Sequence, residues 1–193
     1  MSLAKKIKKP YTYKDYLTWS DDIRCEIIDG VIYDMTPAPV TIHQNISGEI
    51  YGQFWFYLKN KKCQIYHAPF DVRLPNGSED ENHITTVVQP DITVICDKKK
   101  LDEKGCIGAP DLIVEISSPA TASKDLTKKF NLYEKHGVRE YWIVHPEEKT
   151  VMVFSLGKDK LYGRPKNYSA NDKIKVGVLK GLTIDLNDVF AGK

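Results

Sequence analysis

The chain has 193 residues, with 28 Lys and Arg against 26 Asp and Glu, which gives a formal net charge of +2. This length supports one domain with a sizeable core, so we expect a single domain over residues 1–193. The nearly balanced charge excludes a general polycation, and no apolar run in the sequence has the length of a membrane span.

Lysines cluster locally at 4–9, 59–62, 98–100 and 124–129. Such clusters are either solvated side chains or, where they gather on one face, an electrostatic footprint for a polyanion.

Four cysteines are scattered without a CxxC pair or a zinc-ligand spacing: Cys25, Cys63, Cys96 and Cys106. The first three lie in apolar runs, where free cysteines behave as small core residues. The basic N-terminus lacks an apolar segment of signal length. We therefore expect a reduced, cytoplasmic protein without a membrane partner.

The N-terminal part of the chain predicts two helices around a hairpin. Residues 11–19 are predicted to form a short amphipathic helix. Residues 25–35 are predicted to form a hairpin with a tight turn at Asp29-Gly30. Residues 41–60 predict a long helix, because apolar residues recur there at steps of four: Ile42, Ile46, Ile50, Phe54 and Leu58.

Three strands are expected next, at 63–74, 85–95 and 109–118, with polar loops between them at 76–83 and 97–105. The third strand is apolar on both sides, which is typical of a central position in a sheet.

A turn and a helix follow the third strand, with Ser123 as the expected N-cap and Gly137 as the stop. A strand at 139–146 pairs with 147–156 as a hairpin, and further short strands end at 182–190. The order helix, three strands, helix, strand predicts a layered α/β or α+β domain with a mixed sheet. The crossover helix allows the strands that flank it to lie parallel.

Two carboxylates interrupt this apolar pattern. Glu115 lies inside the run LIVEI, and Asp91 follows Pro90 on the neighbouring strand. If both point off one face at ~4–5 Å, they repel by roughly 3–4 kcal/mol, which a shared proton or a bound cation relieves. Hard oxygen ligands suit Mg²⁺, with Mn²⁺ as an alternative, and such an ion activates water at a phosphate. A structural Arg or Lys partner for Glu115 is the competing interpretation.

The helix after Glu115 carries Asp125, Lys129 and Tyr133 at steps of four, so these residues share one face. Lys129 is either a surface partner of Asp125, which contributes little stability, or a catalytic cation aimed over the strand end.

The series of motifs resembles the PD-(D/E)XK nuclease superfamily and, more closely, the Uma-two endonuclease family. The resemblance covers roughly residues 11 to 190 and rests on these stretches: CEIIDGVIYDMTPAP, TIHQNI, VVQPDITVI, PDLIVEISSPAT, the spacing of Asp125, Lys129 and Tyr133, and GVREYWIVHP. It implies a restriction endonuclease-like core, preceded by the hairpin and followed by the extra strands.

The resemblance also implies site residues. The superfamily pattern has a lysine two residues after the glutamate, where this chain has Ser117. In the family, the lysine is displaced to the next helix, which gives the role to Lys129, with Lys128 as a competitor. Asp111, four residues before Glu115 on the same strand, is too close to be the motif aspartate.

Glu26 matches the family's upstream acid and joins the expected catalytic and metal-binding set of Asp91 and Glu115. Glu49 on the long helix is a rival for that position. His43, Ser117, Lys128 and Tyr133 are expected nearer the substrate, although His43 and Tyr133 also suit packing.

We therefore expect a Mg²⁺-dependent endonuclease that hydrolyses DNA phosphodiesters, as a homodimer with one site per strand. The alternatives are an inactive nuclease-like module that binds nucleic acid or protein, and an enzyme acting on RNA or nucleotides.

Overall fold

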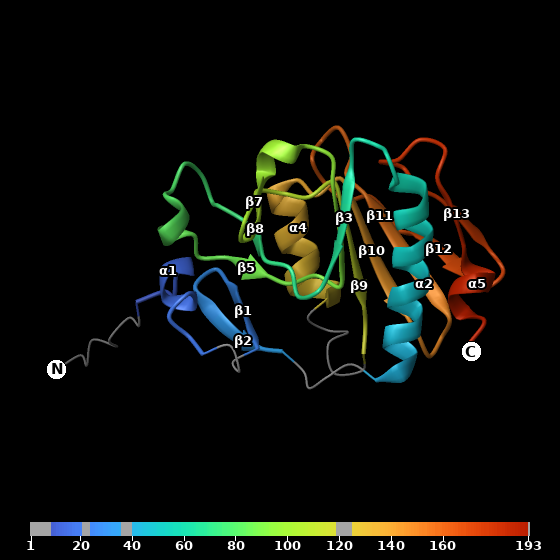
Figure 1. The fold of residues 1–193 in the computed structure, drawn as a ribbon, viewed down its shortest axis with the longest axis horizontal. Coiled ribbons are helices and arrows are strands. Elements are labelled where there is room, and N and C mark those ends of the chain that lie inside the picture. Colours follow the sequence, from blue (N-terminus) through green and yellow to red (C-terminus); the bar gives the residue numbers. More distant parts are fainter. Residues whose placement is uncertain (1–8, 21–23, 36–39, 119–124, 193) are drawn as a thin grey trace.

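The computed structural model describes residues 9–20, 24–35, 40–118 and 125–192. Two six-stranded sheets form most of it. Figure 1 shows the sheet with the longer strands at the centre of the molecule. The strand order of this central sheet is β12-β11-β10-β9-β6-β3. Its strands are β3 (Gln64–His67), β6 (Ile92–Ile95), β9 (Leu112–Ile116), β10 (Glu140–His145), β11 (Thr150–Ser155) and β12 (Lys166–Ser169).

The central sheet is mixed, as expected. Strands β9 and β10 pair in parallel, whereas β3–β6, β6–β9, β10–β11 and β11–β12 pair antiparallel. All five residues of β9 are buried, which confirms the central place predicted from its apolar run.

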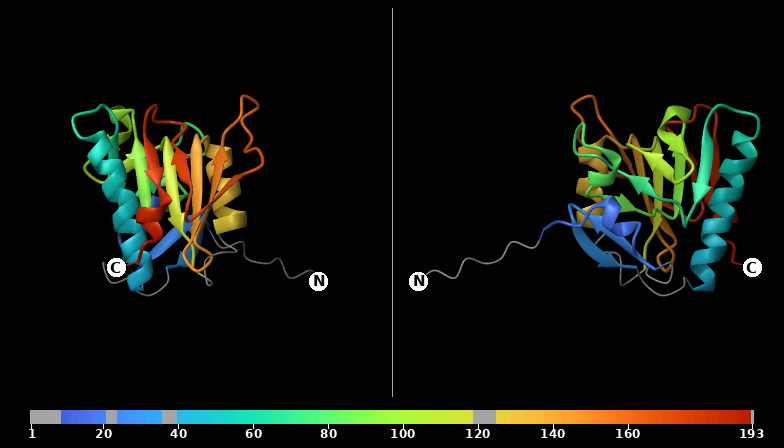
Figure 2. Two further views of the ribbon diagram at one scale, coloured as in Figure 1. Left: turned by 90° about the vertical axis from the view of Figure 1, so that its right-hand side faces the viewer. Right: turned by 60° about the vertical axis from the view of Figure 1, so that its left-hand side comes forward.

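Two helices cover opposite faces of this sheet, and Figure 2 shows the strands between them. Helix α2 (Thr41–Leu58) buries Ile46, Ile50, Phe54 and Leu58 against one face. Ile42, the first residue of the predicted stripe, is 46% exposed, because the helix begins beyond the edge of the packed layer. On the other face lies helix α4 (Phe130–His136), which ends at Gly137 in the left-handed conformation (φ 83°), as predicted.

The second sheet packs on the α4 side of the molecule and has the order β2-β1-β5-β4-β8-β7. Its strands are β1 (Cys25–Ile28), β2 (Val31–Asp34), β4 (Val72–Arg73), β5 (Val87–Val88), β7 (Leu101–Asp102) and β8 (Gly105–Ile107). The predicted hairpin is confirmed, with Asp29 and Gly30 both at positive φ between β1 and β2.

The remaining elements are short. They are α1 (Tyr13–Tyr16), the 3-10 turns η1 (Glu81–His83) and η2 (Lys98–Lys100), the π-turn η3 (Asp125–Lys129), the pair β13 (Lys173–Lys175) and β14 (Thr183–Asp185), and helix α5 (Leu186–Phe190).

Several sequence predictions require correction. The expected strands 63–74 and 85–95 are each divided between the two sheets, as β3 and β4 and as β5 and β6, because the chain breaks at Pro69 and at Pro90-Asp91. The expected loop 97–105 contains η2 and β7. The segment 182–190 is β14 followed by α5, since Asp185 caps the helix by accepting from the backbone of Asn187. Ser123 lies outside the described residues.

The expectation of four free cysteines is wrong for two of them. Strands β3 and β6 pair with Gln64 opposite Ile95, so Cys63 and Cys96 face each other one position further, where they form a disulfide. Cys25 and Cys106 are free and buried. In the part of the chain that the structure describes, no helix combines the length and apolarity needed to cross a membrane.

Candidate active site

Glu115 lies near the carboxyl end of β9 and is 4% exposed. Its Oε1 accepts hydrogen bonds from Lys129 Nζ at 2.8 Å and from the Tyr133 hydroxyl at 2.7 Å. Burial, together with the charges of Glu115 and Glu26, raises the pKa of Tyr133 well above its ordinary value of 10.0, so its hydroxyl remains a donor. The cost of burying this carboxylate is therefore offset by a cation and a phenol.

Glu26 reaches the same lysine from the second sheet. It lies on β1, is 1% exposed, and its Oε1 is 3.0 Å from Lys129 Nζ. The same oxygen accepts from the backbone N–H of Gln89 at 3.1 Å. Lys129 thus joins a carboxylate from each sheet and is itself only 5% exposed, so the alternative of a surface ion pair is wrong.

The helix preceding β10 begins with a π-turn, and this turn sets the position of Lys129. η3 ends at Lys129, and α4 continues directly from Phe130. Tyr133 follows one helical turn later, which places both donors over Glu115, as their spacing predicted. Such wide turns within helices occur frequently at functional sites.

Asp91 lies next to this cluster, immediately before β6. Its Oδ2 accepts from the backbone N–H of Ile116 at 2.7 Å and lies 3.3 Å from His43 Nε2 at the start of α2. The Asp91 side chain is 21% exposed, so solvent reaches it. Among the described residues, His43 Nδ1 is buried without a hydrogen-bond partner. His43 therefore contacts the site, although only the Nε2 side is engaged.

The register of the central sheet brings the two predicted carboxylates together. Ile92 pairs with Val114, so Asp91 and Glu115 occupy the next facing positions, and the hydrogen bond to Ile116 fixes Asp91 there. Within the described residues, no three His, Cys, Asp or Glu side chains lie close enough to hold one metal ion between them. Two carboxylates still fit Mg²⁺, which commonly binds one or two protein carboxylates and takes water and phosphate oxygens as its other ligands.

Other predicted residues lie apart from Glu115 or serve the backbone. Lys128 is exposed and donates to the Tyr33 hydroxyl at 2.8 Å, over the ring of Tyr33. Ser117 is buried, and its backbone N–H bonds to Val144, extending the strand pairing by one residue. Asp111 binds the backbone of Cys96 and the side chain of Arg139, a structural role. The side chain of Asp125 lies outside the described part of the chain.

Gln89 is a member of the site that the motifs did not reveal. It stands two residues before Asp91, its backbone holds Glu26, and its side chain points into a neighbouring cavity. Its only sequence signal is its place directly before Pro90-Asp91.

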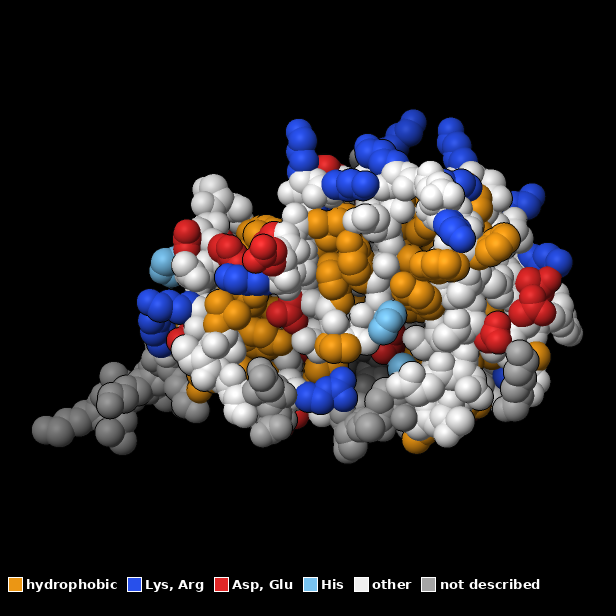
Figure 3. Space-filling model, in the orientation of Figure 1, with side chains coloured by type: hydrophobic (Ala, Val, Ile, Leu, Met, Phe, Trp, Pro, Cys, Tyr) orange, Lys and Arg blue, Asp and Glu red, His pale blue; other side chains and the backbone are white. Residues whose placement is uncertain are grey.

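Two of the lysine clusters, at 59–62 and 98–100, lie away from this site. Pairing of β3 with β6 brings the exposed Lys59, Lys61 and Lys62 near Lys98 and Lys99. Basic side chains gather along the upper edge of the molecule in Figure 3. Asp91 is at the opposite end of β6, about 17 Å away along an extended strand.

A buried carboxylate, a lysine and a second carboxylate at the end of the central strands of a mixed sheet define a restriction endonuclease-like α/β protein. The crystal structure of a "putative nuclease belonging to DUF820" from Anabaena variabilis superposes with a TM-score of 0.73 and 22% identity, over 94% of this chain and 98% of that one. The family model of Uma2, described as "Putative restriction endonuclease", matches residues 13–187, and the chain belongs to this family. An uncharacterized protein of Synechocystis sp. is 26% identical over 182 residues, 93% of this chain and 90% of that protein.

Proposed function

We propose that the chain is a nuclease that hydrolyses DNA phosphodiester bonds with a divalent cation bound at Asp91 and Glu115. The observation that carries this proposal is the pairing of these carboxylates across β6 and β9, with Lys129 2.8 Å from Glu115. Membership of the Uma2 family supports the same reaction class.

Each side chain has a defined task in this proposal. The Ile116 N–H donates to Oδ2 of Asp91, and in this proposal Oδ1 binds the cation. Lys129 Nζ orients the attacking water or neutralises a phosphate oxygen, and Glu26 holds that nitrogen in place from β1. The cation, once bound, polarises the phosphate and lowers the pKa of a coordinated water. Glu26 thus acts through Lys129 in this arrangement, rather than as a metal ligand.

The first experiment is nicking of supercoiled plasmid in Mg²⁺ and in Mn²⁺, with EDTA as a blank. Loss of the charge-bearing ligand in Glu115→Gln or Asp91→Asn is expected to reduce the rate by at least ~10²-fold. Glu49→Gln is the matched control, because Glu49 is a half-buried acid on α2 and the rival for the upstream position. It should retain the wild-type rate.

Calorimetric titration with Mn²⁺ separates a silent enzyme from an inert site. Heat of binding that disappears in Glu115→Gln supports the metal site even if the plasmid lacks a cleavable sequence. Absence of both nicking and Mn²⁺ binding would instead identify Glu115, Lys129 and Glu26 as a structural ion cluster in a nuclease-like binding module. Nuclease domains that cut both strands of a duplex often use two sites, one for each strand. We therefore further propose a homodimer, which light scattering of the purified chain tests.

A further inference from the structure

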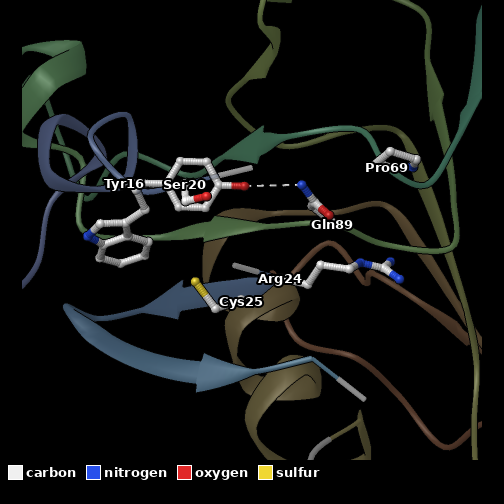
Figure 4. Close-up of a pocket in the computed structure, with 7 residues that line it drawn as sticks. Tyr16, Ser20, Arg24, Cys25, Pro69 and Gln89 are labelled. Atoms are coloured by element: carbon white, nitrogen blue, oxygen red, sulfur yellow. Dashed lines mark hydrogen bonds between the residues drawn. The ribbon is translucent and has the colours of Figure 1, made fainter. Parts of the chain in front are cut away.

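A cavity of about 380 Å³ lies next to the candidate active site, between the α1 segment and the start of β1. Figure 4 shows its lining, which includes Tyr16, Trp19, Ser20, Arg24, Pro69 and Gln89. This volume is within the range of roughly 300–1,000 Å³ typical of small-molecule sites, and the residues combine aromatic faces with a few polar groups.

Two backbone hydrogen bonds connect the walls of the cavity to Glu26 and to the backbone of Asp91. Gln89, on the cavity wall, donates its backbone N–H to Glu26 Oε1 at 3.1 Å. Pro69, on the opposite part of the lining, follows Ala68, whose N–H donates to the carbonyl of Asp91 at 3.1 Å. The cavity is therefore bordered by the segments of chain that carry Glu26 and Asp91.

The side chain of Gln89 is held in one orientation. Its Nε2 donates to Asp71 Oδ1 at 2.8 Å and to the Tyr16 hydroxyl at 3.1 Å, and the same hydroxyl donates to Asp71 at 3.2 Å. A carboxylate only accepts hydrogen bonds, so the amide nitrogen must face Asp71. Oε1 then faces the cavity, and no described residue donates to it, which leaves a fixed acceptor for a ligand.

The aromatic part of the lining is held equally firmly. The Trp19 ring meets Tyr16 edge-on with centroids 5.6 Å apart, and it meets Tyr11 edge-on at 5.8 Å. Burial, and then the charge of Asp71, raises the pKa of Tyr16, so its hydroxyl stays protonated. Arg24 at the rim is exposed and carries a guanidinium, a group suited to phosphate.

We propose that this cavity receives an unpaired nucleobase next to the scissile phosphate, so that the substrate is single-stranded DNA or a locally opened duplex. The inference rests on the proposed nuclease function. Trp19 supplies a stacking surface, Gln89 Oε1 accepts from a ring or amino N–H of the base, and Arg24 contacts the adjoining phosphate. A base within an intact duplex has its faces stacked and its edge paired, so it must first leave the helix to enter.

The test is fluorescence anisotropy in EDTA, where no cleavage occurs, with one labelled oligonucleotide as a single strand, as a perfect duplex and as a duplex with a one-nucleotide bulge. We expect the wild type to prefer the single strand and the bulge by about fivefold or more. Trp19→Ala should lose this preference, because stacking of one base contributes on that scale. Trp55→Ala, at a 49% exposed tryptophan on α2, is the matched control and should bind as the wild type does.

Trp19 packs against two tyrosines, so Trp19→Phe supplies a second variant that keeps a stacking ring. It should retain the single-strand preference while losing the tryptophan quenching that the wild type shows on titration with the single strand. Equal affinity for all three oligonucleotides, or an unchanged preference in folded Trp19→Ala, overturns the inference. The plasmid and Mn²⁺ assays test the nuclease independently of the base pocket. Nicking that depends on Glu115 but not on Trp19 refutes only the base pocket. Trp19-dependent binding of the oligonucleotides, with neither nicking nor Mn²⁺ binding, refutes only the nuclease.

Discussion

Replacing Lys129 with methionine tests the electrostatic arrangement of the site directly. Lys129 Nζ lies 2.8 Å from Glu115 Oε1 and 3.0 Å from Glu26 Oε1, so the two oxygens are at most about 6 Å apart. All three side chains are at most 7% exposed. Without the lysine, two buried carboxylates face each other with no cation between them.

The magnitude follows from these distances. At ~6 Å and an effective dielectric near 20, two like charges repel by about 3 kcal/mol, in addition to the attraction lost. Removing one partner of a buried ion pair usually costs about 3–5 kcal/mol. We therefore expect Lys129→Met to lower the free energy of unfolding by about 3–5 kcal/mol. Native proteins usually have an unfolding free energy of about 5–15 kcal/mol, so the variant stays folded if the wild type lies above the lower end of that range.

The assay is urea unfolding in EDTA, with Lys128→Met as the control. Lys128 is the neighbouring lysine, but it is exposed and contacts the partly exposed Tyr33, so its loss should cost less than about 1 kcal/mol. The double variant Lys129→Met with Glu26→Gln should be more stable than Lys129→Met alone, because glutamine removes the repulsion and still accepts from Gln89. Equal losses of unfolding free energy in Lys129→Met and Lys128→Met would refute this reasoning. A double variant that is less stable than Lys129→Met would also refute it.

Three further predictions concern the same helix. Tyr133→Phe removes a 2.7 Å hydrogen bond to the buried Glu115 and should cost about 1–3 kcal/mol, read by thermal unfolding. Burial and a neighbouring lysine lower the pKa of His136 below its ordinary 6.5, so its contribution to stability is complete above pH 6.5 and is lost as the pH falls toward the lowered pKa. His136→Asn should therefore flatten the stability profile below pH 6.5, and an unchanged slope in urea titrations would contradict this. Ser117→Lys combined with Lys129→Met returns the cation to the strand and should recover part of the plasmid nicking lost in Lys129→Met; recovery of none would show that the helix position is required.

The central sheet was predictable because its local signals agree with its packing. The run LIVEI is buried along its whole length as β9, and the stripe from Ile46 to Leu58 is the buried side of α2. The division of 63–74 and 85–95 between two sheets was not predictable, because apolar alternation continues through each break. Pro69 and Pro90 mark these breaks, but a proline does not show which sheet the next strand joins.

The disulfide shows a similar limit. Cys63 and Cys96 are separated by 33 residues, and nothing in their spacing links them. Their pairing depends on the antiparallel register of β3 and β6, a long-range feature that the spacing of the two cysteines does not contain.

The candidate site likewise contains residues that the sequence predicted and one role that it did not. Asp91 and Glu115 were predictable because they are carboxylates in the apolar runs of two adjacent strands. A buried carboxylate requires a partner, and Lys129 supplies it for Glu115. The period of four in the next helix then identified Lys129 and Tyr133. The role of Glu26 as a partner of that lysine was not accessible from spacing, since it depends on how the second sheet packs beside α4.

Under the proposed function, the position of Lys129 accounts for the absence of a lysine at Ser117. Ser117 and Glu115 are two residues apart on an extended segment, so their side chains leave the same face, the face that α4 covers. A lysine at either place, on the strand or on the covering helix, points into the same space beside Glu115. Placement on the helix adds one requirement: a buried Nζ needs a second negative partner, and Glu26 on β1 supplies it at 3.0 Å. Under the proposed function the N-terminal hairpin is part of the active site, because it carries Glu26, the second buried partner of Lys129.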